Sequence, residues 1–302
     1  ALQKGDFISS PYFNIGADDP RFHSLAAKFS ETLFERFHSF AKSNLVKGHP
    51  LLVSGGCGLN CDWNTRWKNS PLFRDVFVPP CTSDSGSAIG TAVDAMRHYT
   101  GRAKLDWDVN SGQAFVDDQI DLVDVAMTEV NLTEVAAALF EGAIIGWATD
   151  NCEIGPRALG NRSILAAPFE IETRKKLNRV KGRHADAPIA PVCLEEDVSE
   201  HFDWSGPSPY MLHFQKVIDP RLKAVEHLDG TARVQTVTHK QNARLYTLLQ
   251  EFKKLSGFGV LCNTSLNFKE AGFINKTSDL CHYARTNGLD AFVAGISFYR
   301  FK

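Results

Sequence analysis

Short apolar runs alternate with amphipathic helical patterns along this chain, and polar or glycine-rich turns follow several of the runs. Residues 50–54 and 75–78 read as strands, and residues 22–44 repeat apolar side chains at the spacing of one helix face. This alternation is typical of α/β proteins, which we therefore predict. We expect further helices near 88–98, 133–140, 172–181, 242–255 and 278–285, and extended segments at 142–148, 187–193, 232–237, 260–262 and 291–294.

The apolar face of the 22–44 segment has two interpretations. The first, which we favour, is that its apolar residues pack inside their own domain; they are Leu25, Phe29, Leu33, Phe34, Phe37 and Phe40. The second is that they form a surface for a partner protein.

Length and charge narrow the class of protein. A chain of 302 residues exceeds one average core, so we expect two domains, and the polar stretch 101–127 is a plausible boundary. A formal charge of −2 makes a nucleic-acid partner unlikely, and no apolar run has the length of a membrane span, so no membrane partner is expected.

The seven cysteines are expected to be reduced thiols in a cytoplasmic protein. Cys57 and Cys61 form a CxxxC pair, but no second pair follows at zinc-site spacing, so a zinc or redox role is the minor alternative. The first ten residues lack the apolar core of a signal peptide, which agrees with this expectation.

The segment 153–163, EIGPRALGNRS, follows a predicted strand. Small residues let backbone N–H groups approach an anion, and Arg157 and Arg162 could clamp its oxygens. The pattern indicates phosphate or carboxylate capture, and the alternative is a surface turn with two solvated arginines.

Two earlier turns follow strands as well. Gly55, Gly56 and Asn60 lie in a glycine-rich turn that suits close approach to a phosphate or sugar, or has a purely structural role. Asp84 and Gly86 lie at a strand-to-helix turn, where Asp84 is either a helix N-cap or an oxygen ligand for a metal.

Segments later in the chain contain further candidate site residues with cationic, amide or hydroxyl side chains. Lys181 and Arg183 end a basic helix, and Arg233 lies in a half-buried strand pattern, where a guanidinium needs a partner. Asn263, Ser265 and Asn267 follow an apolar strand and form either a polar turn or a set of donors for an oxyanion.

These motifs occur together in a fixed order. They are SGGCGLN (54–60), SDSGSAIGTA (83–92), GWATDNCEIGPRALGNRSILA (146–166), VKGR (180–183), APIAP (187–191), LDGTARVQ (228–235) and NTSLN (263–267). The set resembles the NodU/CmcH family of O-carbamoyltransferases, including the tobramycin type, over about residues 22–300.

The resemblance implies a two-part architecture. Residues 1–120 would be the C-terminal lobe of an actin/Hsp70-like (ASKHA) carbamoyl-transfer domain, and residues 121–302 a YrdC-like domain that makes carbamoyl-adenylate from carbamoyl phosphate and ATP. The expected cofactors are ATP, Fe²⁺ or a similar divalent metal, and Mg²⁺, and the carbamoyl group would pass to an acceptor hydroxyl.

The resemblance also implies roles for single residues. Arg157, Lys181 and Arg233 would be catalytic and Asp84 would hold the metal. Substrate and nucleotide would contact Gly55, Gly56, Asn60, Gly86, Arg162, Ser163, Arg183, Asn263, Ser265 and Asn267.

Two departures from the family pattern matter. The N-terminal lobe that carries the HxxxH metal ligands in the family is absent, so we expect a fragment or a subunit of a split enzyme, with a second chain as a candidate partner. Ala187 replaces an arginine of the family's RPxAP motif, so a different small acyl donor is an alternative, as is a nucleotide-binding subunit without catalysis. The acceptor is not readable from the sequence.

Overall fold

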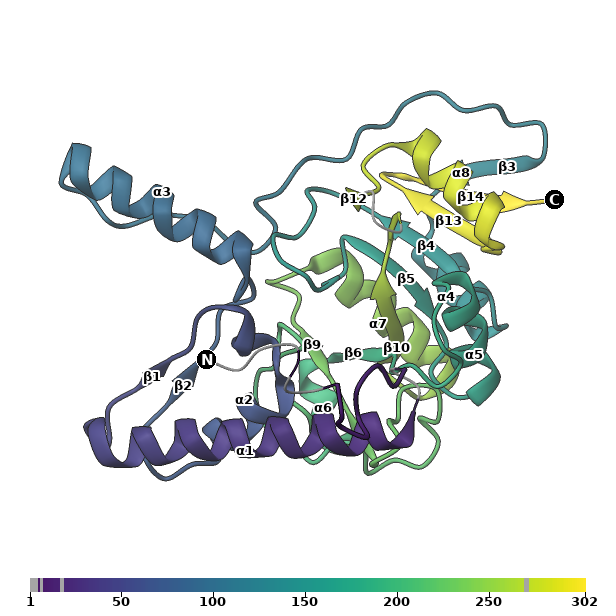
Figure 1. Cartoon of the computed structure of the whole chain (residues 1–302). Coiled ribbons are helices and arrows are strands. Elements are labelled where there is room, and N and C mark those ends of the chain that lie inside the picture. The colour runs from purple at the N-terminus through teal and green to yellow at the C-terminus, as the bar shows by residue number, and fades with distance from the viewer. Residues whose placement is uncertain (1–4, 6–7, 17–18, 269–271) are drawn as a thin grey trace. The chain divides into compact units, whose positions relative to one another are not determined.

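The computed structural model describes residues 5, 8–16, 19–268 and 272–302. The chain divides into two compact units, one formed by Ala1–Leu51 and Arg66–Phe77 and the other by Leu52–Thr65 and Val78–Lys302. The sequence-based boundary at 120/121 lies inside the second unit and stays a prediction. Figure 1 labels many of the helices and strands of both units.

The first unit is built on one long helix, α1 (Pro20–Asn44). Asp19 caps its start by accepting a hydrogen bond from the backbone N–H of Arg21, and Pro20 needs no donor at the first helical position. The first unit also contains β2 (Val76–Phe77) and Leu51 of β1 (Leu51–Leu52), the strand that pairs with β2.

The apolar face of α1 is mostly open. Phe34 packs against Trp67 with ring centroids 4.8 Å apart, and Phe34 and Ala41 are the helix's buried residues. Phe29 is 67% exposed and Phe40 is 60% exposed. The favoured expectation, that this face packs inside its own domain, is therefore wrong for most of the face.

The second unit is centred on a mixed eight-stranded sheet in the order β3-β14-β13-β4-β5-β10-β6-β9. The pairs β13–β4 and β6–β9 are parallel and the other neighbours are antiparallel. The strands are β3 (Val125–Glu129), β4 (Ile145–Ala148), β5 (Arg162–Ala166), β6 (Ala190–Leu194), β9 (Gln235–Val237), β10 (Val260–Ser265), β13 (Ala291–Ala294) and β14 (Ser297–Phe301).

Helices cover both faces of this sheet. On one face, α4 (Leu132–Phe140) and α7 (Ala243–Ser256) form a core with alternate strand residues such as Leu165 and Leu261. On the other, α5 (Ile171–Val180) and α8 (Thr277–Asn287) pack with the intervening residues, such as Ile164 and Cys262. The period-two alternation of each strand thus fills two separate cores.

Shorter elements complete the chain. Helix α3 (Asp84–Thr100) has no buried residue and ends at Gly101 in the left-handed conformation. The others are η2 (Gly56–Leu59), α2 (Cys61–Lys68), η3 (Glu195–Asp197), α6 (Val198–His201), β7 (Gln215–Lys216), β8 (Thr231–Ala232), β11 (Asn267–Phe268) and β12 (Gly272–Phe273). None of the helices in the described part of the chain combines the length and apolar character that crossing a bilayer requires.

The predicted helices and the α/β class are confirmed, while several strands differ from the predictions. The expected strand at 232–237 is two strands, β8 and β9, which belong to different sheets and are separated by Arg233 and Val234. Residues 263–265 continue β10 instead of forming a turn, because all three pair with β5 and Asn263 pairs with β6 as well.

Candidate anion-binding site

A pocket of about 250 Å³ lies where β10 ends and β6 begins. Three guanidinium groups, those of Arg157, Arg183 and Arg233, line it, and no carboxylate is among its lining residues. We call it the arginine pocket. Its other lining residues are Pro156, Ala158, Ala187, Pro188, Ala190, Met211, Asn263, Thr264 and Ser265.

The loop that carries Arg157 can form only with glycine at two positions. Gly155 has φ 126° and Gly160 has φ 111°, a region that other residues rarely adopt. A Cβ at Gly155 would lie 2.7 Å from the Pro80 oxygen, and one at Gly160 would lie 2.4 Å from Cδ2 of Leu245. Both glycines therefore allow the loop to pack closely against its surroundings.

Arg233 and Arg157 place unbalanced positive charge in the pocket. Burial, the nearby Arg157 and, more weakly, Arg183 lower the pKa of Arg233 to about 10. The Nε atoms of Arg157 and Arg233 are buried without a hydrogen-bond partner among the described residues. Arg157 Nη2 donates to the Leu59 oxygen at 3.4 Å. An anion would offset the repulsion and supply the missing acceptors.

A second pocket of about 460 Å³ adjoins the first through Arg183 and Ser265, which line both. Lys181 lies in it and donates from Nζ to the Ser265 oxygen at 2.6 Å and to Asn267 Oδ1 at 2.8 Å. Burial and the neighbouring Arg183 lower the pKa of Lys181 to about 8. We call this second cavity the lysine pocket.

The loop between α5 and β6 is held by a buried amide. Asn178 Nδ2 donates to the oxygens of Ala185 and Ala187 at 2.8 and 2.9 Å. This fixes the segment that carries Arg183 and places Ala187 in the wall of the arginine pocket.

Two residues expected to contact the anion lie elsewhere. Arg162 is 1% exposed in β5, and its guanidinium donates to main-chain oxygens. Ser163 is buried beside it and also lines neither pocket. The structure therefore does not bring Arg162 into a clamp with Arg157, because its donors already hold the backbone. The acceptors of Arg162 are the oxygens of Gln113, Thr149, Asp150 and Asn161, and Asn275 Oδ1.

The glycine-rich turn adjoins Arg157 through Leu59 but does not line the arginine pocket. Gly55 has φ 82° and open space where a Cβ would be, and Gly56 is open as well. Asn60 Oδ1 accepts from the Trp63 N–H at the start of α2, so this side chain has a local structural role.

Asp84 and Gly86 lie in the first turn of α3. Ser83, not Asp84, occupies the N-cap position, and Asp84 is exposed. A Cβ at Gly86 would lie 2.1 Å from the Cys81 oxygen, so Gly86 is needed for packing. Within the described ranges, no group of three His, Cys, Asp or Glu side chains could hold a metal ion.

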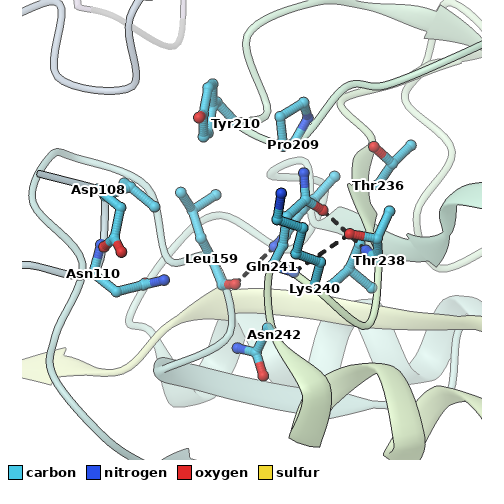
Figure 2. A pocket seen from close by; sticks show the side chains of 13 residues that line it. Asp108, Asn110, Leu159, Pro209, Tyr210, Thr236, Thr238, Lys240, Gln241 and Asn242 are labelled. Carbon is cyan, nitrogen blue, oxygen red and sulfur yellow. Dashed lines mark hydrogen bonds between the residues drawn. The ribbon is translucent and has the colours of Figure 1, made fainter.

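A third pocket, of about 410 Å³, is shown in Figure 2. Leu159, which adjoins Ala158 of the arginine pocket, and Tyr210, which adjoins Met211, contribute to its walls. Tyr210 has a raised pKa because of burial and the nearby Asp108. None of its lining residues was among the predicted site residues, although Leu159 and Gln235 lie within the motifs at 153–163 and 228–235.

The family model described as Carbamoyltransferase C-terminus matches residues 136–300, which contain both cationic pockets, and the one described as Carbamoyltransferase N-terminus matches residues 13–93. The chain belongs to the carbamoyltransferase family. The resemblance drawn from the motifs is therefore confirmed.

Curated carbamoyltransferase relatives match nearly the whole chain. The 3'-hydroxymethylcephem-O-carbamoyltransferase of Amycolatopsis lactamdurans is 46% identical, over 98% of this chain and 58% of its own length. Nodulation protein U of Rhizobium fredii is 35% identical, over 93% of this chain and 49% of its own length. The chain thus spans about half the length of these relatives.

Among solved structures, the chain is similar to P. abyssi Sua5 complexed with L-threonine. The TM-score is 0.38 at 14% identity, over 60% of this chain and 49% of that one. A likeness at this level does not assign the fold.

Proposed function

We propose that this chain carries the donor-activating part of an ATP-dependent O-carbamoyltransferase. The supporting observation is the pair of adjoining cationic pockets that share Arg183 and Ser265. Two neighbouring anion sites suit two phosphate-bearing substrates: water would release carbamate and phosphate from carbamoyl phosphate, and carbamate and ATP would then give carbamoyl-adenylate and pyrophosphate. The carbamoyl group then passes to an acceptor hydroxyl.

The proposed chemistry is mainly positioning and charge stabilisation. Phosphate and pyrophosphate leave as anions, and Arg157, Arg233 and Lys181 would offset the charge that develops on them. Because the pockets are partly buried, these cations act in a medium where Coulombic attraction is stronger than in water.

Two finer assignments belong to the proposal. We assign residues 121–302 to a YrdC-like activating domain and residues 1–120 to part of an actin/Hsp70-like transfer domain. The two family models match on either side of this boundary, which supports the division. For the acceptor we propose a hydroxyl, as in the cephem substrate named for the Amycolatopsis relative.

The residues described here do not by themselves fit a metal centre. Asp84 is a single exposed carboxylate without other candidate ligands grouped around it among the described residues. We therefore derive no step through Fe²⁺ or Mg²⁺, and the role of Asp84 stays a prediction.

The experiment is an assay of pyrophosphate release by this chain with ATP and carbamoyl phosphate. We expect release that requires both substrates and falls at least about tenfold in Arg233→Met, which removes a charge-assisted contact. If the folded wild-type chain releases no pyrophosphate, the proposed activation step is wrong.

Ala187 supports a second candidate, activation of a different acyl donor. Because Ala187 lines the arginine pocket, the family's guanidinium is missing from the wall where the donor would bind. Calorimetric titration with carbamoyl phosphate and acetyl phosphate distinguishes the two. Equal affinity would favour the alternative donor.

The open face of α1 supports a third candidate, a nucleotide-binding subunit of a split enzyme. Its exposed aromatic residues would suit a second chain that supplies an N-terminal lobe. Co-purification of a second polypeptide carrying an HxxxH motif from the source cells would support this candidate, and its absence would count against it.

A further inference from the structure

Glu153 is a buried carboxylate that the motif analysis left without a role. It is 2% exposed, and its Oε1 accepts backbone hydrogen bonds from Leu159 at 2.6 Å, Asn161 at 2.8 Å and Arg162 at 3.3 Å. These three donors follow Arg157 in the same loop. One carboxylate oxygen at the start of the loop therefore binds three backbone N–H groups at its end.

Side-chain amides also donate hydrogen bonds to carbonyl oxygens of this loop. Gln235 Nε2 donates to the Leu159 oxygen at 2.7 Å, and Asn263 Nδ2 donates to the Ala158 oxygen at 3.2 Å and to Gln235 Oε1 at 2.8 Å. The peptide groups next to Arg157 are thus fixed by side chains from three separate segments. All three side chains are at least nine-tenths buried.

We propose that Glu153 is a positioning residue for anion binding, which aims Arg157 into the arginine pocket by holding the 154–161 loop. This inference rests on the proposed function. Glu153 has no favourable charge effect on an anion, because a negative carboxylate repels a negative ligand. Any favourable effect of Glu153 on anion binding must therefore come from the way it holds the loop that carries Arg157.

The direction in which removing Glu153 changes anion affinity distinguishes a positioning role from an effect of its charge. If Glu153 acted only through its charge, neutralising it would strengthen binding of an anion. If it positions Arg157, removing it weakens binding even though a repulsive charge is lost. Glu153→Gln retains one acceptor oxygen for the backbone donors and should fall between wild type and Glu153→Ala.

The test is isothermal titration of inorganic phosphate into wild type, Glu153→Ala and Glu153→Gln. We expect at least about tenfold weaker binding in Glu153→Ala, which loses three charge-assisted contacts, and a smaller loss in Glu153→Gln. Asp197→Ala is the matched control. It removes another buried carboxylate, paired with Lys253 on a different segment, and should lower the melting temperature without changing phosphate affinity.

The outcomes of these titrations test the positioning role of Glu153 and the proposed function separately. Phosphate binding by Glu153→Ala that equals or exceeds that of wild type overturns the inference and leaves the proposed function intact. If wild type itself binds no phosphate, the proposed function fails as well. Should Glu153→Ala not fold, Glu153→Gln decides alone, and tighter or unchanged binding in that variant overturns the positioning role.

Discussion

The ammonium group of Lys181 donates a 2.6 Å hydrogen bond to the main-chain oxygen of Ser265, the last residue of β10. This contact ties the end of α5 to the end of a central strand, at the point where the arginine and lysine pockets meet. Lys181 is thus both a structural link and a cation close to any bound anion.

The protonation of Lys181 should make stability depend on pH. Burial and Arg183 lower its pKa from 10.5 to about 8 in the folded chain. Between these two values the unfolded chain binds more protons, so stability rises with pH. Urea unfolding should show wild type gaining stability relative to Lys181→Met between pH 8 and 10.5, with a constant difference below pH 7. If wild type instead lost stability relative to Lys181→Met over this pH range, the lowered pKa of Lys181 would be contradicted.

Phosphate affinity should fall as the pH rises through about 8, because neutral Lys181 no longer attracts an anion. Lys181→Arg stays charged over this range and should show a flatter profile. Calorimetry at pH 7 and pH 9 measures both. Parallel profiles for the two proteins would exclude Lys181 as the titrating group.

Arg233→Met should stabilise the ligand-free chain while weakening anion binding. The variant removes a buried charge that Arg157 and Arg183 repel, and replacing such a charge by an apolar side chain is often neutral or stabilising. We expect an unchanged or higher melting temperature without phosphate and a much smaller rise on adding phosphate. A lower melting temperature without phosphate would show that Arg233 has a structural role.

Arg162→Lys should lower stability by about 2–4 kcal/mol, since lysine cannot replace the several donors that hold main-chain oxygens. Phosphate affinity of the folded fraction should stay within about threefold of wild type, because Arg162 lines neither pocket. Denaturant unfolding and calorimetry measure the two effects. A large loss of phosphate affinity in Arg162→Lys would indicate that Arg162 binds the anion after all.

Two glycines in α3 provide a matched pair. Gly86→Ala should destabilise by about 1–3 kcal/mol, because the new Cβ would lie 2.1 Å from the Cys81 oxygen. Gly90 lies in the same helix with open space around it, so Gly90→Ala should stabilise by about 0.5–1 kcal/mol. Thermal unfolding of both variants tests the pair, and equal effects would contradict the packing role of Gly86.

Sequence patterns predicted the helices well, because apolar spacing is a local signal. They did not predict the surroundings of Arg162, because its burial depends on β5 pairing with β4 and β10 from distant segments. The exposure of Phe29 was also unpredictable, since an amphipathic pattern says which face is apolar but not what covers it.

The candidate site was partly predictable. Arg157, Arg183 and Arg233 are far apart in sequence, yet the structure gathers them in one pocket, in agreement with the motif set. The motifs did not point to Glu153, because its backbone contacts depend on the loop's final conformation. A carboxylate a few residues before a glycine-bounded loop is the signal that could have suggested it.

Helix α3 has no buried side chain over its 17 residues, so its helical state relies on local propensity and on the left-handed Gly101 at its end. Most helical stability in proteins comes from the packing of an apolar face, which α3 largely lacks. Its amide protons should exchange with solvent far faster than those of β10, and a protease should cleave there first. Amide exchange in α3 can therefore be used to detect binding. Slower exchange along this helix would show that another molecule covers it.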